Sequence, residues 1–114
     1  MRTELLRFLD NYEPEQFKLL EELVLQSSFS RYKAGVDAVG RLIDASLKTT
    51  GMTLEKVAES GLGDQLIFRS PGYRVGKPSL LLVGHMDTVF PQGSDFNFYR
   101  ENGSKVHGPG VIDM

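Results

Sequence analysis

The sequence of 114 residues contains no cysteine. This absence excludes disulfide scaffolds, thiolate metal sites and cysteine nucleophiles. Positive charge is also scarce, since 13 lysines and arginines face 15 aspartates and glutamates and give a net charge of −2. Nucleic acids and anionic membranes are bound by concentrated positive fields. We therefore expect neither a nucleic-acid partner nor a membrane partner.

Long hydrophobic runs are missing as well. The longest aliphatic run is Leu80 to Val83, whereas a membrane-spanning helix needs about 20 apolar residues. The first ten residues carry charges where a signal peptide would be apolar. The remaining composition, 40% apolar and 25% charged, is typical of one globular domain. We expect a soluble, cytoplasmic protein.

Apolar residues recur at helical spacing in the first half of the chain. Residues 4–12 predict a short amphipathic helix, and Pro14 is expected to open a second one because a proline is tolerated in the first turn. Serines then predict a loop over residues 27–35. A third helix is predicted from Val36 to Leu47, with Gly51 as its left-handed terminating residue.

After Gly51 the chain changes to short apolar runs separated by turn residues, which predict strands at 54–58, 65–69 and 80–83. The last run has no polar face, so it indicates a strand buried on both sides of a sheet. Asn102-Gly103 predicts a hairpin turn between residues 96–101 and 105–107. Helices followed by strands favour an α/β domain with helices packed on a sheet.

Two residues that can carry chemistry follow the apolar run. His85 and Asp87 are two positions apart, so their side chains leave the same face if the strand continues. An imidazole can coordinate zinc while a neighbouring carboxylate orients the ring, and open α/β sheets bind ligands at the carboxyl ends of strands. A histidine that makes only ordinary hydrogen bonds near a turn is the alternative interpretation.

A second candidate segment runs from Gly108 to Met114 and carries one carboxylate, Asp113. A buried aspartate needs a cation or several hydrogen-bond donors. The segment does not fit a nucleotide-binding loop, because the third glycine and the lysine of such loops are missing. Asp113 as a helix N-cap is the alternative interpretation.

Together these segments, Leu-Leu-Leu-Val-Gly-His85-Met-Asp87-Thr-Val-Phe-Pro and Gly-Pro-Gly-Val-Ile-Asp113-Met, resemble a zinc-dependent amidohydrolase and peptidase family. That family contains glutamate carboxypeptidase, acetylornithine deacetylase and succinyl-diaminopimelate desuccinylase. The order of elements agrees along most of the chain, while only residues 80–114 carry sharp motifs. The resemblance implies that residues 1–114 form the N-terminal part of a three-layer catalytic domain, with helices packed on a mixed sheet.

The resemblance also implies roles for single residues. His85 is implied as a ligand of one zinc, Asp113 as the carboxylate bridging two zincs, and Asp87 as the catalytic-site carboxylate that supports them. The peptide bond after the bridging aspartate is usually cis in that family. The implied reaction is hydrolysis of an amide or peptide bond next to a free carboxylate, in a small peptide or an N-acyl amino acid.

The sequence departs from the family pattern where it stops at Met114. The paired glutamates, the later ligands and the lid and dimerisation domain are not present in it. Catalytic zinc sites use three protein ligands, and this chain offers two. We therefore expect the chain to bind zinc weakly and to be inactive alone, while a longer parent is a zinc hydrolase.

Other candidates have simpler interpretations. His107 stands where the family often has tyrosine, and we interpret it as a turn or surface histidine. Serines 27, 28 and 30 are interpreted as loop and cap residues, since they lack the strained turn of a hydrolase nucleophile. The alternative to a hydrolase fragment is a non-catalytic binding module that pairs with itself or a partner through exposed sheet edges.

Overall fold

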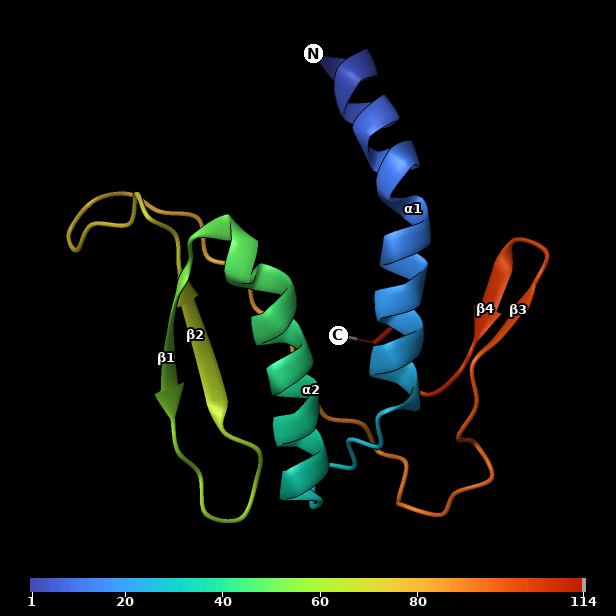
Figure 1. Cartoon of the computed structure of the whole chain (residues 1–114). Helices are drawn as coiled ribbons and strands as arrows, with labels where there is room; N and C mark the ends of the chain where they lie inside the picture. The colour runs from blue at the N-terminus through green and yellow to red at the C-terminus, as the bar shows by residue number, and fades with distance from the viewer. Residues whose placement is uncertain (114) are drawn as a thin grey trace.

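The fold is that of a computed structural model, which describes residues 1–113. Two helices come first in the chain and two separate antiparallel hairpins follow. Figure 1 shows helix α2 beside the first hairpin, and helix α1 between α2 and the second hairpin. The elements are α1 (Arg2–Leu25), α2 (Lys33–Leu47), the 3-10 turn η1 (Lys48–Thr50), β1 (Thr53–Val57), β2 (Gln65–Arg69), β3 (Arg100–Asn102) and β4 (Lys105–His107).

Helix α1 is continuous through Pro14. The prediction that Pro14 opens a second helix is therefore wrong. A proline inside a helix has no N–H to donate to the carbonyl four residues earlier, here that of Asp10. Both residues are exposed, so water can take the place of the missing hydrogen bond. The helix continues across Pro14 although apolar residues before it, such as Leu5 and Phe8, are exposed.

Helix α2 and its termination follow the prediction closely. It begins at Lys33, three residues before the predicted start, and ends at Leu47. The short turn η1 carries the chain to Gly51, which has a φ of 73°. A left-handed residue at this place is favourable for glycine, which has no Cβ to clash. Val36 and Val39 of the predicted apolar stripe are buried.

The first hairpin pairs β1 with β2 in the register Leu54↔Phe68 and Lys56↔Leu66. Both strands lie within a residue of their predicted bounds. The hairpin packs on α2 at glycines: a Cβ on Gly40 would lie 3.0 Å from Leu66 Cδ1, and a Cβ on Gly63 would lie 2.3 Å from Val36 Cγ1. The absence of side chains at these two positions lets helix and hairpin approach closely.

An ionic contact fixes the start of α2 to the loop of this hairpin. Lys33 Nζ lies 2.5 Å from Asp64 Oδ1 and 3.0 Å from Asp37 Oδ2. The Asp64 backbone N–H also donates to Asp37 Oδ1. The pKa of Lys33 is raised by its hydrogen bonds to Asp64 and Asp37, and the pKa of Asp64 is lowered, mainly by the hydrogen bond from Lys33. The contact therefore favours the charged forms of these groups.

The predicted buried strand at residues 80–83 is not formed. The four side chains are 81–86% exposed, and the segment has no strand assignment. A strand needs hydrogen-bonding neighbours, and neither described hairpin pairs with this segment. The local pattern indicates a strand that could be buried, but no other part of residues 1–113 supplies the sheet around it.

The second hairpin is shorter than predicted, and its turn is shifted by one residue. Strands β3 and β4 pair Asn102 with Lys105, so the turn consists of Gly103 and Ser104, with a φ of 60° at Gly103. Residues 96–99 precede the ladder. Phe96 packs edge-on against Phe90 and Phe98, with ring centroids 4.9 and 5.2 Å apart. These aromatic contacts connect the hairpin to the segment after His85.

The described residues thus form a mixed α/β structure with two small antiparallel sheets. The single mixed sheet expected from the sequence does not appear among residues 1–113. The core is small, and its buried aliphatic side chains are Val24, Val36 and Val39. None of the described helices combines the length and the apolar character needed to cross a bilayer.

Gly108 lies where the end of α1 packs against the segment next to the second hairpin. Its substitution tests this packing. A Cβ at Gly108 would lie 2.5 Å from Val24 Cγ1 and 2.7 Å from the Phe98 carbonyl oxygen. Overpacking a tight contact typically costs about 1–3 kcal/mol. We expect Gly108→Ala to lower the free energy of unfolding by this amount in urea denaturation. Gly61→Ala is the matched control, since its Cβ would meet no atom within 4 Å, and an equal loss in both variants would contradict the packing described.

Candidate functional site

His85 is held by Asp87 through one side of its ring. The Nδ1 atom lies 3.0 Å from the Asp87 carbonyl oxygen and 3.2 Å from Asp87 Oδ1. Both partners are acceptors, so Nδ1 carries the proton and donates it. In the neutral ring this leaves the lone pair on Nε2, the tautomer that a metal ligand needs.

The other side of the ring faces Asp113. His85 Nε2 lies 3.4 Å from Asp113 Oδ1, across 28 positions of sequence. The pKa of His85 is raised, first by the hydrogen bond to Asp113 and then by the Asp87 carbonyl group. In the absence of another cation, a proton on Nε2 balances the nearby carboxylate. A divalent cation between Nε2 and Oδ1 could take the place of that proton, because it supplies positive charge to the same two atoms.

Asp87 is itself held by a serine from a distant part of the chain. The Ser30 hydroxyl donates to Asp87 Oδ2 at 2.5 Å, while Oδ1 of the same carboxylate faces His85. The pKa of Asp87 is lowered, mainly by this hydrogen bond, although burial acts in the opposite direction. Asp87 therefore stays ionised and accepts from both neighbours at once.

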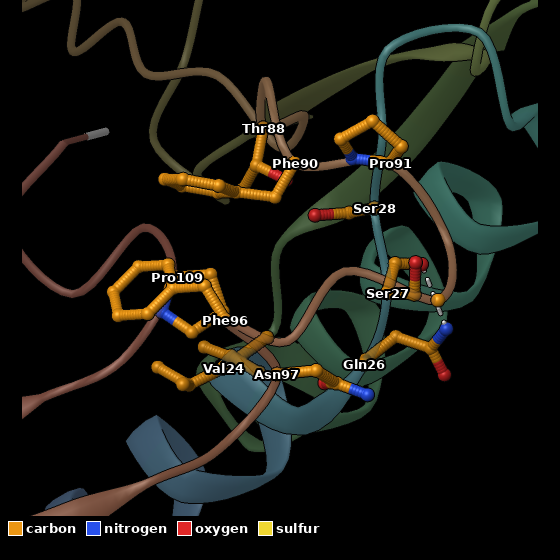
Figure 2. A pocket seen from close by; sticks show the side chains of 12 residues that line it. Val24, Gln26, Ser27, Ser28, Thr88, Phe90, Pro91, Phe96, Asn97 and Pro109 are labelled. Atoms are coloured by element: carbon orange, nitrogen blue, oxygen red, sulfur yellow. Dashed lines mark hydrogen bonds between the residues drawn. The ribbon is translucent and has the colours of Figure 1, made fainter.

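The loop after α1 forms the backbone support of this contact. The Ser30 N–H donates to the Thr88 carbonyl at 3.0 Å, and the Thr88 N–H donates to the Ser28 carbonyl at 2.8 Å. Phe29 and Thr88 form an isolated parallel bridge. Figure 2 shows Ser27 and Ser28 with Thr88 across a small cavity at this junction. The segment carrying Asp87 is thus paired with the serine loop rather than with a sheet.

A hollow of about 440 Å³ opens next to the two carboxylates. His85, Asp87, Asp113 and His107 are among the residues that line it. The rest of the wall is largely apolar. It comes from residues before, within and after the second hairpin: Val89, Phe90, Phe96, Val106, Val111 and Ile112. A few polar groups in an apolar hollow are typical of a small-molecule site.

The donor set suits a zinc ion but does not complete a site. An imidazole nitrogen and a carboxylate oxygen are ordinary zinc ligands, and here they face one another. Among residues 1–113 no group of three or more histidine, aspartate or glutamate side chains is arranged to hold a metal ion. The described residues therefore offer two ligands, one fewer than a catalytic zinc site uses.

The structure brings together the three residues singled out from the sequence. His85, Asp87 and Asp113 form one chain of contacts. The sequence predicts His85 at the end of a strand. In the structure it lies in an irregular segment. The expected cis peptide bond joins Asp113 to Met114 and lies outside the described residues.

Ser30 and His107 also lie at this site. The sequence predicts Ser30 as a loop or cap residue, whereas its hydroxyl binds Asp87. The contact spans 57 positions, and the loop and cap prediction for serines 27, 28 and 30 does not distinguish which of them makes it. His107 is exposed, as predicted, and also lines the hollow.

Comparison with known proteins gives a partial match that agrees with the family resemblance. The chain is similar to Carboxypeptidase G2 from Pseudomonas sp. (strain RS-16), with 36% identity over 104 residues. The match covers 89% of this chain and 25% of that protein, so the chain spans about a quarter of the length of the curated relative it matches. No protein-family model matches the chain.

The match supports the resemblance at the level of a family of hydrolases. It includes most of the chain, whereas the sharp sequence motifs lie only in residues 80–114. Because three quarters of the relative lie outside the match, the activity of such a protein as a whole remains a proposal for this one.

Proposed function

We propose that this chain supplies the first metal-binding groups of a zinc-dependent hydrolase similar to Carboxypeptidase G2. The observation that carries the proposal is the approach of His85 Nε2 to within 3.4 Å of Asp113 Oδ1. In this proposal the two side chains bind zinc, and Asp87 orients the ring. The three-layer catalytic domain implied by the resemblance is part of the same proposal.

Zinc bound between His85 and Asp113 would polarise a substrate carbonyl and lower the pKa of a bound water. The chain's own residues orient the ligand and shape the surroundings of the substrate. Asp87 fixes the tautomer of His85, because Nδ1 donates to its carbonyl and carboxylate oxygens. The apolar wall of the hollow, which includes Phe90 and Phe96, would contact the apolar parts of the bound substrate.

The substrate class follows from the resemblance and fits the hollow. The proposed reaction cleaves an amide or peptide bond next to a free carboxylate, in a small peptide or an N-acyl amino acid. A volume of about 440 Å³ lies in the range of small-molecule sites, about 300–1,000 Å³. The remaining ligands and the general base are proposed to come from a longer protein that contains this chain.

The hydrolase proposal is tested on a protein of the relative's length that contains this chain. We expect cleavage of N-acyl amino acids or glutamyl amides that is abolished by a chelator and restored by zinc. We expect His85→Ala to lower kcat/KM by at least about 100-fold, because changing a residue that only orients a metal ligand already costs about 10–100-fold.

His107→Ala is the control for that assay, because His107 lines the hollow without contacting the two carboxylates in the described structure. Cleavage that does not depend on a metal ion would contradict the proposal. So would equal losses of activity in the His85 and His107 variants.

Self-association is the second candidate function, and the exposure of residues 80–83 favours it. Four consecutive aliphatic side chains that are 81–86% exposed form a segment without a described partner strand, which is a template for pairing with another chain. Homodimers or larger assemblies would bury this segment.

Size-exclusion chromatography of the 114-residue chain tests this candidate. We expect a concentration-dependent shift to a dimer or larger species, and we expect Leu81→Lys to abolish the shift by placing a charge in the segment. Leu62→Lys is a control at another exposed leucine. A chain that stays monomeric at all concentrations would contradict self-association without bearing on the zinc proposal.

A further inference from the structure

We propose that Ser30 is a positioning residue that holds the Asp87 carboxylate in the orientation in which it accepts from His85 Nδ1, beside the Asp87 backbone carbonyl. The inference rests on the proposed function, because the tautomer matters for a metal ligand. It names a residue outside the motifs that carry the resemblance. The observation behind it is the hydrogen bond from Ser30 Oγ to Asp87 Oδ2, across 57 positions of sequence.

A second hydrogen-bond partner keeps the Asp87 carboxylate in place to accept from His85 Nδ1. Its side chain is 41% exposed, and an exposed carboxylate can rotate and exchange its partners with water. The Ser30 hydroxyl binds Oδ2, which leaves Oδ1 3.2 Å from His85 Nδ1. The hydrogen bond therefore selects one orientation of the carboxylate, in which one oxygen faces the serine and the other faces the imidazole.

The backbone around Ser30 is fixed independently of its hydroxyl. The Ser30 N–H donates to the Thr88 carbonyl, and the Thr88 N–H donates to the Ser28 carbonyl. These bonds pair the loop with Thr88, which directly follows Asp87 in the sequence. Removing the hydroxyl leaves both backbone bonds in place, so the loop can remain docked while the carboxylate loses its fixed partner.

The hydroxyl has two acceptors within reach, and charge decides between them. Ser30 Oγ lies 2.5 Å from Asp87 Oδ2 and 3.2 Å from the Thr88 carbonyl oxygen. A hydroxyl has one hydrogen to donate, and hydrogen bonds to ionised acceptors are shorter and stronger. The hydrogen is therefore directed at the carboxylate, which makes the contact specific to Asp87.

The tautomer of His85 in the metal-free chain is the readout for this role. Nitrogen-15 NMR at an alkaline pH, where the ring is neutral, separates the Nδ1–H form from the Nε2–H form. We expect the Nδ1–H form to dominate in the native chain and to lose population in Ser30→Ala and Ser30→Val, but not to vanish, because the Asp87 carbonyl oxygen stays within 3.0 Å of Nδ1. Ser30→Thr keeps the hydroxyl and is expected to keep the native tautomer.

Ser27→Ala is the matched control, because Ser27 lies in the same loop and its hydroxyl makes no hydrogen bond in the described structure. It is expected to leave the tautomer unchanged. A second readout is zinc affinity by titration calorimetry, which we expect to fall about 10-fold in Ser30→Val relative to its isostere Ser30→Thr, as for other residues that orient metal ligands.

Each outcome decides the role of Ser30. Unchanged tautomer populations in folded Ser30→Ala or Ser30→Val would overturn the proposal. Loss of the fold in both hydroxyl-free variants would assign the hydroxyl a structural role and would also overturn it. A native chain that binds no zinc but shows the expected tautomer changes would instead contradict the proposed function and leave the positioning by Ser30 supported.

Discussion

The imidazole of His85 lies between two carboxylates, and this arrangement governs what the candidate site can do. Asp87 accepts from Nδ1 on one side, while Asp113 faces Nε2 on the other. The first contact favours the tautomer with the proton on Nδ1, and the second places the negative charge of Asp113, whose side chain is 85% exposed, beside Nε2. A proton or a metal ion can bind between these two atoms. The same geometry therefore explains the raised pKa of His85 and its suitability as a ligand.

The elements that bring these groups together are loops held by a few close contacts. The serine loop after α1 pairs with Thr88, next to Asp87. Gly108 packs against Val24 at the end of α1, and the chain continues from there to Asp113. The buried aliphatic core of the described residues is small. In the described residues the site is thus positioned by close backbone approach at Gly108 and by hydrogen bonds between backbone groups.

Local patterns in the sequence predicted much of this structure. The apolar spacing of α2, the terminating Gly51 and the first hairpin were found because each depends on neighbouring residues. His85, Asp87 and Asp113 were singled out through the family resemblance of two short motifs, and their side chains form one chain of contacts, while their roles stay predictions. Pro14 misled the prediction, since α1 continues across it without a break. The run at residues 80–83 misled it too, because burial depends on partner strands that a local pattern cannot reveal.

The contact of Ser30 with Asp87 could not be predicted from the sequence. Serine serves as a cap, a turn residue or a hydrogen-bond donor with equal ease. Its contact with Asp87 joins residues 57 positions apart, so no spacing rule identifies it. The approach of His85 Nε2 to Asp113 likewise joins residues 28 positions apart, so it emerges only from the folded structure.

Zinc titration of the 114-residue chain by calorimetry tests the central claim most directly. The claim predicts weak binding of zinc that is lost in His85→Ala and in Asp113→Asn but retained in His107→Ala, which removes the chain's other histidine. Binding that survives both of the first two substitutions, or that depends on His107, would contradict a metal position between His85 and Asp113.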